Sequence, residues 1–527
     1  MPKVRRIVWS ALGWTLTAAA AVLLGAALWI RRTFGPISVD QLLLHLPGAG
    51  GEAPTAAEGG YLTRFIWQAV VIPLLVVALV GLLLLVRRRR RGRRRAPAVP
   101  GRYRSASPSS SVGQHTRWLR PLLVAASCVV GATFFIQSTG LAQYVGSSLT
   151  SWTMDEYYVV PAVESTARTA SNSLDEQKNL VLIFLESGEE AFSDTELFEE
   201  NMLQPLESAT ENWARFERLD VYNGGGWTMA GLVGTECGVP LRGAGVGVSD
   251  INSNEIGADA ESYMPGAVCL GDVLADAGYR NVFLGGADAS FASKEDFLRS
   301  HGYDEVKDLK TWQAEGETEF SEWGLSDRGL MEQAKAEVSR LHESGQPFNL
   351  TVLTLDTHEP VPDFDYCPVE SEEPAVSAYR CSFAQVAGFI DYMREMGYLE
   401  DTAVFITGDH PKMIGEGSVF YAQLSPLGER PLFNRLWDPE HRELARLGID
   451  QLSVYATLLD VLGLGREDGR AGVGVSAFVP SDSGTGVLGL SPEDYAALIE
   501  SRSGELYRRL WGGDEADISA QGVVSER

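Results

Sequence analysis

Three long apolar stretches constrain this chain most strongly: residues 7–30, 65–86 and 118–138. As helices rising ~1.5 Å per residue, each is long enough to cross a hydrocarbon layer of about 30 Å. The first is interpreted as a span and not as a cleaved signal peptide, because two further spans follow it and no clear small-residue cleavage site closes it. The sequence therefore predicts a membrane domain over residues 1–138, with the lipid bilayer as a partner.

Basic residues orient the predicted spans. They precede the first span, within residues 3–6, and form an arginine-rich block after the second, at residues 87–95. Positively charged loops stay on the cytoplasmic side of a membrane. Arg31 and Arg32 lie at the opposite end of the first span, but the larger block outweighs them. We therefore expect a multi-pass membrane protein whose chain is extracytoplasmic after about residue 139.

The formal net charge of −26 conceals an asymmetry along the chain. Residues 1–150 carry 18 Lys and Arg against 3 Asp and Glu, a charge of +15, which leaves −41 for residues 151–527. An acidic exterior domain argues against a nucleic-acid partner and attracts divalent cations. The arginine block beside the second span is therefore interpreted as a topology signal that also contacts anionic lipid head groups.

Four of the five cysteines lie in the predicted exterior part, and Cys128 lies within a span. An even number of cysteines in an oxidising compartment indicates two disulfides. The pairings Cys237–Cys269 and Cys367–Cys381 close the shortest loops, but three connectivities remain open from the sequence. Zinc ligation is the alternative, and no C-x-x-C spacing supports it.

The exterior part has the pattern of an α/β domain. A polar connector is expected at residues 96–116 and a linker at 139–178, before short apolar strands begin to alternate with amphipathic helices. This alternation is typical of a mainly parallel, buried sheet. We expect the catalytic domain at residues 179–480 and a peripheral tail at 481–527, with one helical stretch from Pro492 to Leu510.

Polar side chains that can bind metals follow three of these strands, at residues 179–185, 348–355 and 402–408. The residues that follow are Glu186, Asp356-Thr357-His358 and Asp409-His410, respectively. Ligands of open α/β sheets bind at the carboxyl ends of the strands. An Asp-His pair suits Mn²⁺ or Zn²⁺, although alone it is more often a turn or a helix cap. Glu186 adds a second carboxylate that is costly to bury without a cation, which favours a metal site.

Thr228 is the candidate nucleophile. It follows three glycines in Asn223-Gly-Gly-Gly-Trp-Thr228 and precedes an apolar run that is predicted to be a helix. A helix N-terminus would stabilise a phosphate attached to Thr228, although the residue could instead merely cap that helix. Its hydroxyl needs a bound metal to become a nucleophile. His358 could bind a phosphoryl oxygen or protonate a leaving alkoxide.

The order and local sequence of these motifs resemble the lipoteichoic acid synthase and phosphoglycerol transferase family, a branch of the alkaline phosphatase and sulfatase superfamily. The chain is most similar to its phosphoglycerol transferase I type. The motifs that carry the resemblance are Leu-Glu186-Ser, Thr-Met-Ala-Gly-Leu-Val-Gly-Thr-Glu-Cys-Gly-Val-Pro-Leu at 228–241, Cys-Leu-Gly-Asp at 269–272, the stretch from Gly286 to Tyr303, Trp323-Gly324, Asp-Thr-His358, Gly-Asp409-His410, and residues 34–46 after the first span.

The resemblance implies a chemistry and a bacterial cell membrane as its location. Glu186, Thr228, Asp409 and His410 would bind one Mn²⁺, with Mg²⁺ as the alternative. Thr228 would attack phosphatidylglycerol, release diacylglycerol, and pass phosphoglycerol to a glycan, glycolipid or polyglycerolphosphate acceptor. The residues expected to hold the phosphate or the glycerol are His358, Lys294 and Trp323.

The sequence also departs from its relatives. It has fewer predicted spans than typical lipoteichoic acid synthases, and Glu359 follows His358 where many relatives have a second histidine. Cys237-Gly-Val-Pro-Leu-Arg242 is similar to the C-x-P-x-R signature of sulfatases, but an extra residue separates Cys from Pro. The alternatives are a phosphoethanolamine transferase or phosphodiesterase of the same superfamily, and an inactive membrane-anchored binding protein.

Overall fold

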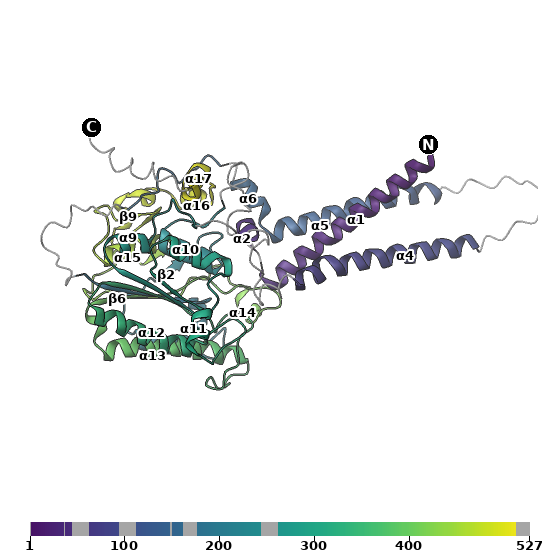
Figure 1. Cartoon of the computed structure of the whole chain (residues 1–527). Coiled ribbons are helices and arrows are strands. Elements are labelled where there is room, and N and C mark those ends of the chain that lie inside the picture. The colour runs from purple at the N-terminus through teal and green to yellow at the C-terminus, as the bar shows by residue number, and fades with distance from the viewer. Residues whose placement is uncertain are drawn as a thin grey trace, which may run out of the picture. The chain divides into compact units, whose positions relative to one another are not determined.

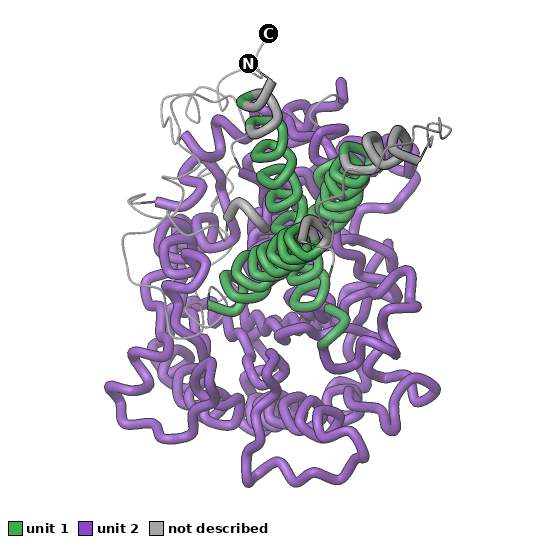
Figure 2. Tube along the Cα trace, turned by 90° about the vertical axis from the view of Figure 1, so that its right-hand side faces the viewer, with its two compact units in different colours: residues 1–38, 54–143, 415–417 green, residues 39–53, 144–414, 418–527 purple. Residues whose placement is uncertain are grey.

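The computed structural model describes residues 2–35, 37–44, 63–93, 112–147, 150–161, 177–243 and 262–512. Figure 1 shows the chain as a ribbon, and Figure 2 colours its two compact units. One unit comprises residues 1–38, 54–143 and 415–417, and the other comprises 39–53, 144–414 and 418–527. Most of the predicted connector at 96–116 and much of the predicted linker at 139–178 lie outside the described residues.

The first unit consists of long apolar helices. Stretches at Val8–Thr33, Thr63–Arg87 and Pro121–Ser138 are long and apolar enough to cross a membrane, which confirms the three predicted apolar helices. They belong to α1 (Pro2–Thr33), the π-helical segment η1 (Ile66–Val71) that leads into α4 (Ile72–Arg93), and α5 (Val112–Ser138).

Small residues let α1 approach its neighbours closely. A Cβ atom on Gly131 of α5 would lie 2.6 Å from the carbonyl oxygen of Ala20 in α1. A Cβ on Gly25 of α1 would likewise lie 2.8 Å from the carbonyl oxygen of Ala69. Membrane helices gain packing energy where small residues bring their backbones together. These contacts are therefore of the kind expected for a bundle of spanning helices.

A six-stranded sheet forms the centre of the second unit, in the order β4-β3-β5-β1-β6-β7. All neighbouring strands are parallel except β6 and β7. The predicted mainly parallel sheet is thus confirmed. Its strands are β1 (Asn179–Leu185), β3 (Arg280–Gly285), β4 (Glu305–Lys307), β5 (Phe348–Leu353), β6 (Thr402–Gly408) and β7 (Asn434–Trp437).

Helices cover both faces of this sheet (Figure 1). On one face α12 (Asp327–Ser344) and α13 (Pro374–Glu395) pack over a core of their own, and on the other α8 (Thr228–Cys237), α9 (Leu270–Asp276) and α15 (Leu452–Val461) form a second core. Successive side chains of a strand point to opposite faces. In β1, Leu180, Leu182 and Phe184 enter one core, and Val181, Ile183 and Leu185 enter the other.

Shorter elements complete the two units. These are α2 (Val39–Leu44), α6 (Leu141–Ser147), α7 (Gln204–Ala209), β2 (Arg218–Asp220), α10 (Lys294–Ser300), α11 (Leu309–Glu315), α14 (Tyr421–Leu424), β8 (Gly448–Asp450), β9 (Arg470–Ala471), β10 (Gly474–Val475), α16 (Pro492–Glu500) and α17 (Gly504–Gly512).

The C-terminal segment, which we expected to be peripheral, contributes side chains to the core between residues 487 and 511. It forms two helices, α16 and α17, and not one. Their apolar side chains join the same core as α8 and α15, namely Leu498, Ile499, Leu506, Tyr507, Leu510 and Trp511. The many Ser, Gly and Asp residues between these positions conceal the apolar stripe in the sequence.

Both disulfides are present in the pairing that closes the shortest loops. Cys237 at the end of α8 is bonded to Cys269 just before α9, and Cys367 is bonded to Cys381 in α13. Cys237 and Cys269 are fully buried, whereas Cys367 and Cys381 are half-buried. Cys128 is a free thiol.

A buried ion pair within the second unit joins Asp40, from the N-terminal part of the chain, to Arg502 near its C-terminal part. Asp40 of α2 accepts hydrogen bonds at 3.0 and 2.6 Å from the two terminal nitrogens of Arg502. Its carboxylate also lies 3.6 Å from the guanidinium of Arg242, and the three side chains are only 8–12% exposed. Removing one partner from such a cluster leaves a buried charge uncompensated.

We therefore expect Asp40→Ala to lower the free energy of unfolding of the detergent-solubilised protein by about 3 kcal/mol or more. The measurement is denaturant unfolding of the full-length chain. Glu429→Ala is the matched control, because Glu429 pairs with Arg218 at 2.7 Å but both side chains are exposed. That variant should lose less than about 1 kcal/mol. An equal loss of unfolding free energy in the two variants would show that burial of the Asp40 ion pair does not make it more important than an exposed pair.

Candidate active site

Three of the predicted metal ligands meet at the carboxyl ends of β1 and β6. Each of Glu186, Asp409 and His410 offers one ligand atom, and these atoms lie within 4.8 Å of one another. His410 Nε2 is 3.7 Å from Glu186 Oε1 and 3.5 Å from Asp409 Oδ2. All three residues are buried. The adjacent strands β1 and β6 run parallel, which is why residues far apart in the sequence converge here.

The backbone around the two carboxylates is tightly fixed. Ser187 adopts a positive φ of 56° and donates its N–H to Asp409 Oδ1 at 2.8 Å. The His410 N–H donates to the same oxygen at 2.7 Å. A Cβ on Gly408 would lie 1.8 Å from the carbonyl oxygen of Gly188, so only glycine allows the two strand ends to approach this closely.

The remaining donor atoms suit a divalent cation. Asp409 Oδ2 is buried and has no hydrogen-bond partner among the described residues. His410 Nδ1 lies 2.8 Å from the carbonyl oxygen of Pro411, which can only accept, so this nitrogen carries the proton and Nε2 offers its lone pair. Such a second hydrogen bond is typical of metal-binding histidines. The two carboxylates and the imidazole therefore fit Mn²⁺ or Zn²⁺.

The titration of these groups reflects their crowding. Burial raises the pKa of Asp409 to about 7; the His410 ring opposes this shift and the Glu186 carboxylate adds to it. Burial opposes protonation of His410, but the carboxylates of Asp409 and Glu186 raise its pKa above the ordinary value. A bound cation would favour the ionised carboxylates and the neutral ring.

Thr228 is the first residue of α8, and its hydroxyl points at this cluster. Its Oγ1 lies 3.5 Å from both Glu186 Oε2 and His410 Nε2. Trp227 occupies the N-cap position, so the alternative in which Thr228 caps the helix is not what the structure shows. A Cβ on Gly231, one turn further on, would lie 2.0 Å from the carbonyl oxygen of Asp409. This glycine therefore lets α8 lie directly against the metal-ligand loop.

His358 and Trp323, two of the predicted substrate-binding residues, form an aromatic pair. Their ring centroids are 4.2 Å apart. His358 Nδ1 and Trp323 Nε1 both donate to the backbone carbonyl of Glu359, at 2.8 and 3.0 Å. Burial lowers the pKa of His358, although the charge of Glu186 partly offsets this. A neutral His358 ring with its proton on Nδ1 presents Nε2 as an acceptor.

Lys294 begins the short helix α10 and is also buried. Burial lowers its pKa, while four carboxylates raise it, first that of Glu186 and then that of Asp409. The charge of Lys294 therefore interacts with the Glu186–Asp409–His410 cluster. Ala292 and Ser293, just before it, both have positive φ angles of 55° and 56°. This tight turn is what brings Lys294 into the interior.

Lys412 is a charged residue near the site that sequence reasoning missed. Its Nζ lies 2.6 Å from Glu359 Oε1 and 5.6 Å from the centroid of the Tyr379 ring. The side chain is 4% exposed, and its charge acts on Glu186, His358 and His410. A lysine after Asp-His-Pro has no sequence pattern that distinguishes it from a solvated one. Glu359, a departure from the family pattern, is its counter-ion.

A second group of potential ligands has a structural role. Cys269, Asp272 and His301 offer atoms within 4.8 Å of one another. The Cys269 sulfur is bonded to Cys237, and the His301 ring nitrogens bind Asp272 Oδ2 at 2.8 Å and the carbonyl oxygen of Tyr263 at 2.9 Å. The thiolate that a metal would need is therefore absent from this cluster.

Residues 178–464 match the sulfatase family, which is more than half of the chain, so this protein belongs to the sulfatase family. The cysteine of its sulfatase-like motif, Cys237, lies in a disulfide at the far end of α8 from Thr228. Thr228 and not this cysteine therefore lies beside Glu186 and His410.

Two relatives are both named phosphoglycerol transferase I. The protein from Xanthomonas axonopodis pv. citri is 36% identical over 363 residues, covering 64% of this chain and 48% of its own length. The protein from Escherichia coli O139:H28 is 31% identical over 320 residues, covering 58% of this chain and 39% of its own. The chain thus spans about half the length of these relatives, or less. This supports the predicted resemblance to the phosphoglycerol transferase branch.

Among solved structures, the lipoteichoic acid synthase LtaP from Listeria monocytogenes is 14% identical, with a TM-score of 0.47 over 66% of this chain and 96% of that one.

Proposed function

We propose that this protein transfers phosphoglycerol from phosphatidylglycerol to a hydroxyl acceptor, through a covalent intermediate on Thr228. The observation that carries the proposal is the position of Thr228 Oγ1, 3.5 Å from both Glu186 and His410 at the N-terminus of α8. A ten-residue helix directs free N–H groups and a positive dipole end toward a phosphate at this point. The names of the two relatives support phosphoglycerol as the group that is transferred.

A divalent cation held by Glu186, Asp409, His410 and Thr228, proposed to be Mn²⁺ with Mg²⁺ as the alternative, would lower the pKa of the Thr228 hydroxyl. Thr228 Oγ1 attacks phosphorus, the bond from phosphorus to the diacylglycerol oxygen breaks, and diacylglycerol leaves with the proton. An acceptor hydroxyl then attacks the same phosphorus. The bond to Oγ1 breaks and Thr228 recovers a proton.

The buried Lys294 and the half-buried Trp323 and His358 are proposed to hold the donor. The ammonium group of Lys294 is suited to a phosphate oxygen, and the Trp323–His358 pair to the glycerol. A neutral His358 accepts a proton through Nε2, which suits removal of a proton from the incoming hydroxyl. The anionic phosphodiester would raise the pKa of this ring, and a protonated His358 could then donate to the leaving alkoxide.

The membrane helices are proposed to keep this site beside its lipid donor, with the second unit outside the cytoplasm. The basic residues at 3–6 and 87–95 support this orientation. The acceptor is proposed to be an extracytoplasmic glycan, glycolipid or polyglycerolphosphate chain, because each offers hydroxyl groups on that side of the membrane.

The test uses full-length protein in vesicles that contain fluorescent phosphatidylglycerol, with Mn²⁺ or with EDTA. We expect diacylglycerol release with Mn²⁺ and a loss of activity with EDTA that added Mn²⁺ restores. Release from phosphatidylethanolamine alone would replace the proposal with a phosphoethanolamine transferase. No release from either lipid, with or without acceptor glycans, would favour a binding protein.

A further inference from the structure

Two buried carboxylates connect the segments that carry the aromatic pair. Asp356 follows β5 and shortly precedes His358, and Asp327 begins α12, shortly after Trp323. Asp327 is 0% exposed and Asp356 is 4% exposed. Neither belongs to the metal cluster, and the proposed transfer reaction uses neither. Two acidic groups buried side by side are costly, so their position requires an explanation.

The two aspartates bind each other's backbone. The Asp327 N–H donates to Asp356 Oδ2 at 2.8 Å, and the Asp356 N–H donates to Asp327 Oδ2 at 3.1 Å. The Leu355 N–H adds a bond of 2.7 Å to Asp327 Oδ1. The start of α12 and the segment that follows β5 are thereby fixed to each other. Trp323 lies shortly before Asp327 and His358 shortly after Asp356. The same hydrogen bonds therefore also limit the distance between these two rings.

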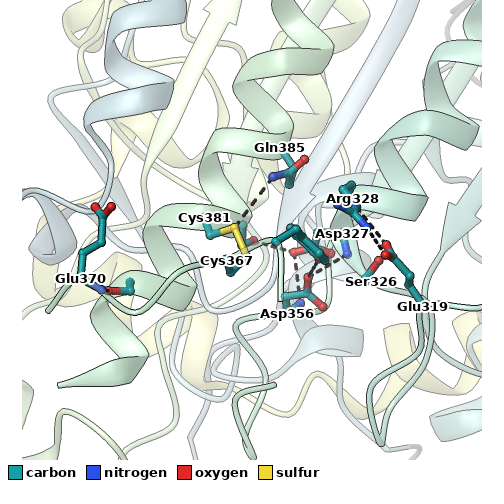
Figure 3. Close-up of a disulfide and its surroundings, with 12 residues drawn as sticks. Glu319, Ser326, Asp327, Arg328, Asp356, Cys367, Glu370, Cys381 and Gln385 are labelled. Atoms are coloured by element: carbon teal, nitrogen blue, oxygen red, sulfur yellow. Dashed lines mark hydrogen bonds and ion pairs between the residues drawn. A yellow bond between two sulfur atoms is a disulfide. The ribbon is translucent and has the colours of Figure 1, made fainter. Parts of the chain in front are cut away.

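The Cys367–Cys381 disulfide closes this network (Figure 3). Tyr366, beside Cys367, donates its hydroxyl to Asp356 Oδ2 at 3.2 Å. Ser382, beside Cys381, donates its hydroxyl to Asp327 Oδ2 at 2.5 Å. The disulfide therefore ties together the two side chains that bind the two carboxylates.

Further contacts hold the outer side of the network. The guanidinium of Arg328 lies 3.9 Å from the centroid of the Tyr366 ring, and it is paired with Glu319. Burial raises the pKa of Asp327 to about 6, and burial together with the charge of Asp327 raises that of Asp356 well above its usual value. The pair thus retains a proton more readily than exposed aspartates do, which reduces the repulsion between them.

We propose that the Asp327–Asp356 pair, supported by the Cys367–Cys381 disulfide, positions the aromatic pair of Trp323 and His358. We call this aromatic pair the Trp323–His358 wall, and its position determines the fit of the lipid head group. The inference rests on the proposed function in one respect, namely that this wall contacts the glycerol. The side chains of the metal ligands make no hydrogen bond to the pair among the described residues. Loosening the network should therefore affect head-group recognition more than the chemistry at phosphorus.

The test compares the double variant Cys367→Ser/Cys381→Ser and the single variant Ser382→Ala with the unaltered enzyme. One substrate is phosphatidylglycerol, and the other is bis(p-nitrophenyl) phosphate, a phosphodiester without glycerol. We expect KM for phosphatidylglycerol to rise roughly tenfold, which corresponds to about 1.4 kcal/mol. Neither kcat for this lipid nor the hydrolysis of bis(p-nitrophenyl) phosphate should change by more than about twofold.

Ser339→Ala is the matched control. Ser339 also makes a hydroxyl contact between α12 and α13, 2.7 Å from the Tyr392 hydroxyl, but it takes no part in the network. This variant should behave like the unaltered enzyme with both substrates. If the disulfide variant lost activity equally with both substrates, or lost activity with neither, the inference would be overturned.

Hydrogen exchange provides a readout that does not depend on the lipid. In the disulfide variant, peptides covering residues 319–327 and 354–367 should lose protection together, because the carboxylate pair couples them. Loss in only one of these segments would contradict the inference. If the unaltered enzyme releases no diacylglycerol from phosphatidylglycerol, the proposed function fails, and this exchange pattern alone decides whether the network positions the wall.

Discussion

Thr228→Ala is expected to lower the rate of diacylglycerol release by roughly a thousandfold or more, the scale seen when a nucleophile is removed. The methyl group that replaces the hydroxyl cannot attack phosphorus. Glu186, Asp409 and His410 remain, so the variant should still bind Mn²⁺, although with lower affinity because one proposed ligand is lost. The measurement is release from fluorescent phosphatidylglycerol at saturating Mn²⁺.

Two further observations separate a nucleophile from a residue that merely supports the site. Thr228→Ser keeps the hydroxyl and should retain a measurable part of the activity. Mass spectrometry of the unaltered enzyme, quenched in acid without an acceptor, should show one phosphoglycerol group on the peptide that contains Thr228. Undiminished turnover by Thr228→Ala, or a label on a different residue, would rule out the proposed intermediate.

Much of the fold and of the cluster of Glu186, Asp409 and His410 could be predicted from local patterns. Glu186 and Asp409 follow apolar strands, and parallel strands end at the same edge of a sheet, so strand ends alone indicated that they would meet. The position of Thr228 followed from its place between a glycine run and an apolar helix. Each of these patterns is local in the sequence, and the topology of the sheet brings the residues that carry them together.

Other features depend on contacts that no local pattern encodes. Asp40 and Arg502 are at opposite ends of the chain and form a buried ion pair. In the sequence, Lys412 cannot be distinguished from a solvated lysine, and only the structure shows that it pairs with Glu359. The apolar positions of α16 and α17 are too few to stand out among polar residues. In each case the partner, and not the residue itself, determines the role, and the partner is known only once the chain has folded.

Asp409→Asn is expected to abolish stabilisation by Mn²⁺ without destabilising the metal-free protein. The substituted side chain would keep an oxygen to accept the N–H groups of Ser187 and His410. The carboxylate oxygen Oδ2, which has no hydrogen-bond partner in the described part of the chain, would be replaced by an amide nitrogen. Burial raises the pKa of Asp409 to about 7, so its ionised form is disfavoured without a cation. The metal-free variant should therefore unfold at the same temperature as the unaltered protein, or higher.

The unaltered protein and the Asp409→Asn variant should differ in stability once Mn²⁺ is added. At a concentration of about a hundred times its Kd, the ion should stabilise the unaltered protein by about 2.7 kcal/mol, and the variant should show almost none of this gain. Thermal unfolding with and without Mn²⁺ measures both effects. Asp401→Asn is the matched control, because Asp401 lies just before the same strand with a half-exposed side chain, 3.0 Å from His342. A variant at Asp409 that gained as much from Mn²⁺ as this control would show that the ion binds elsewhere.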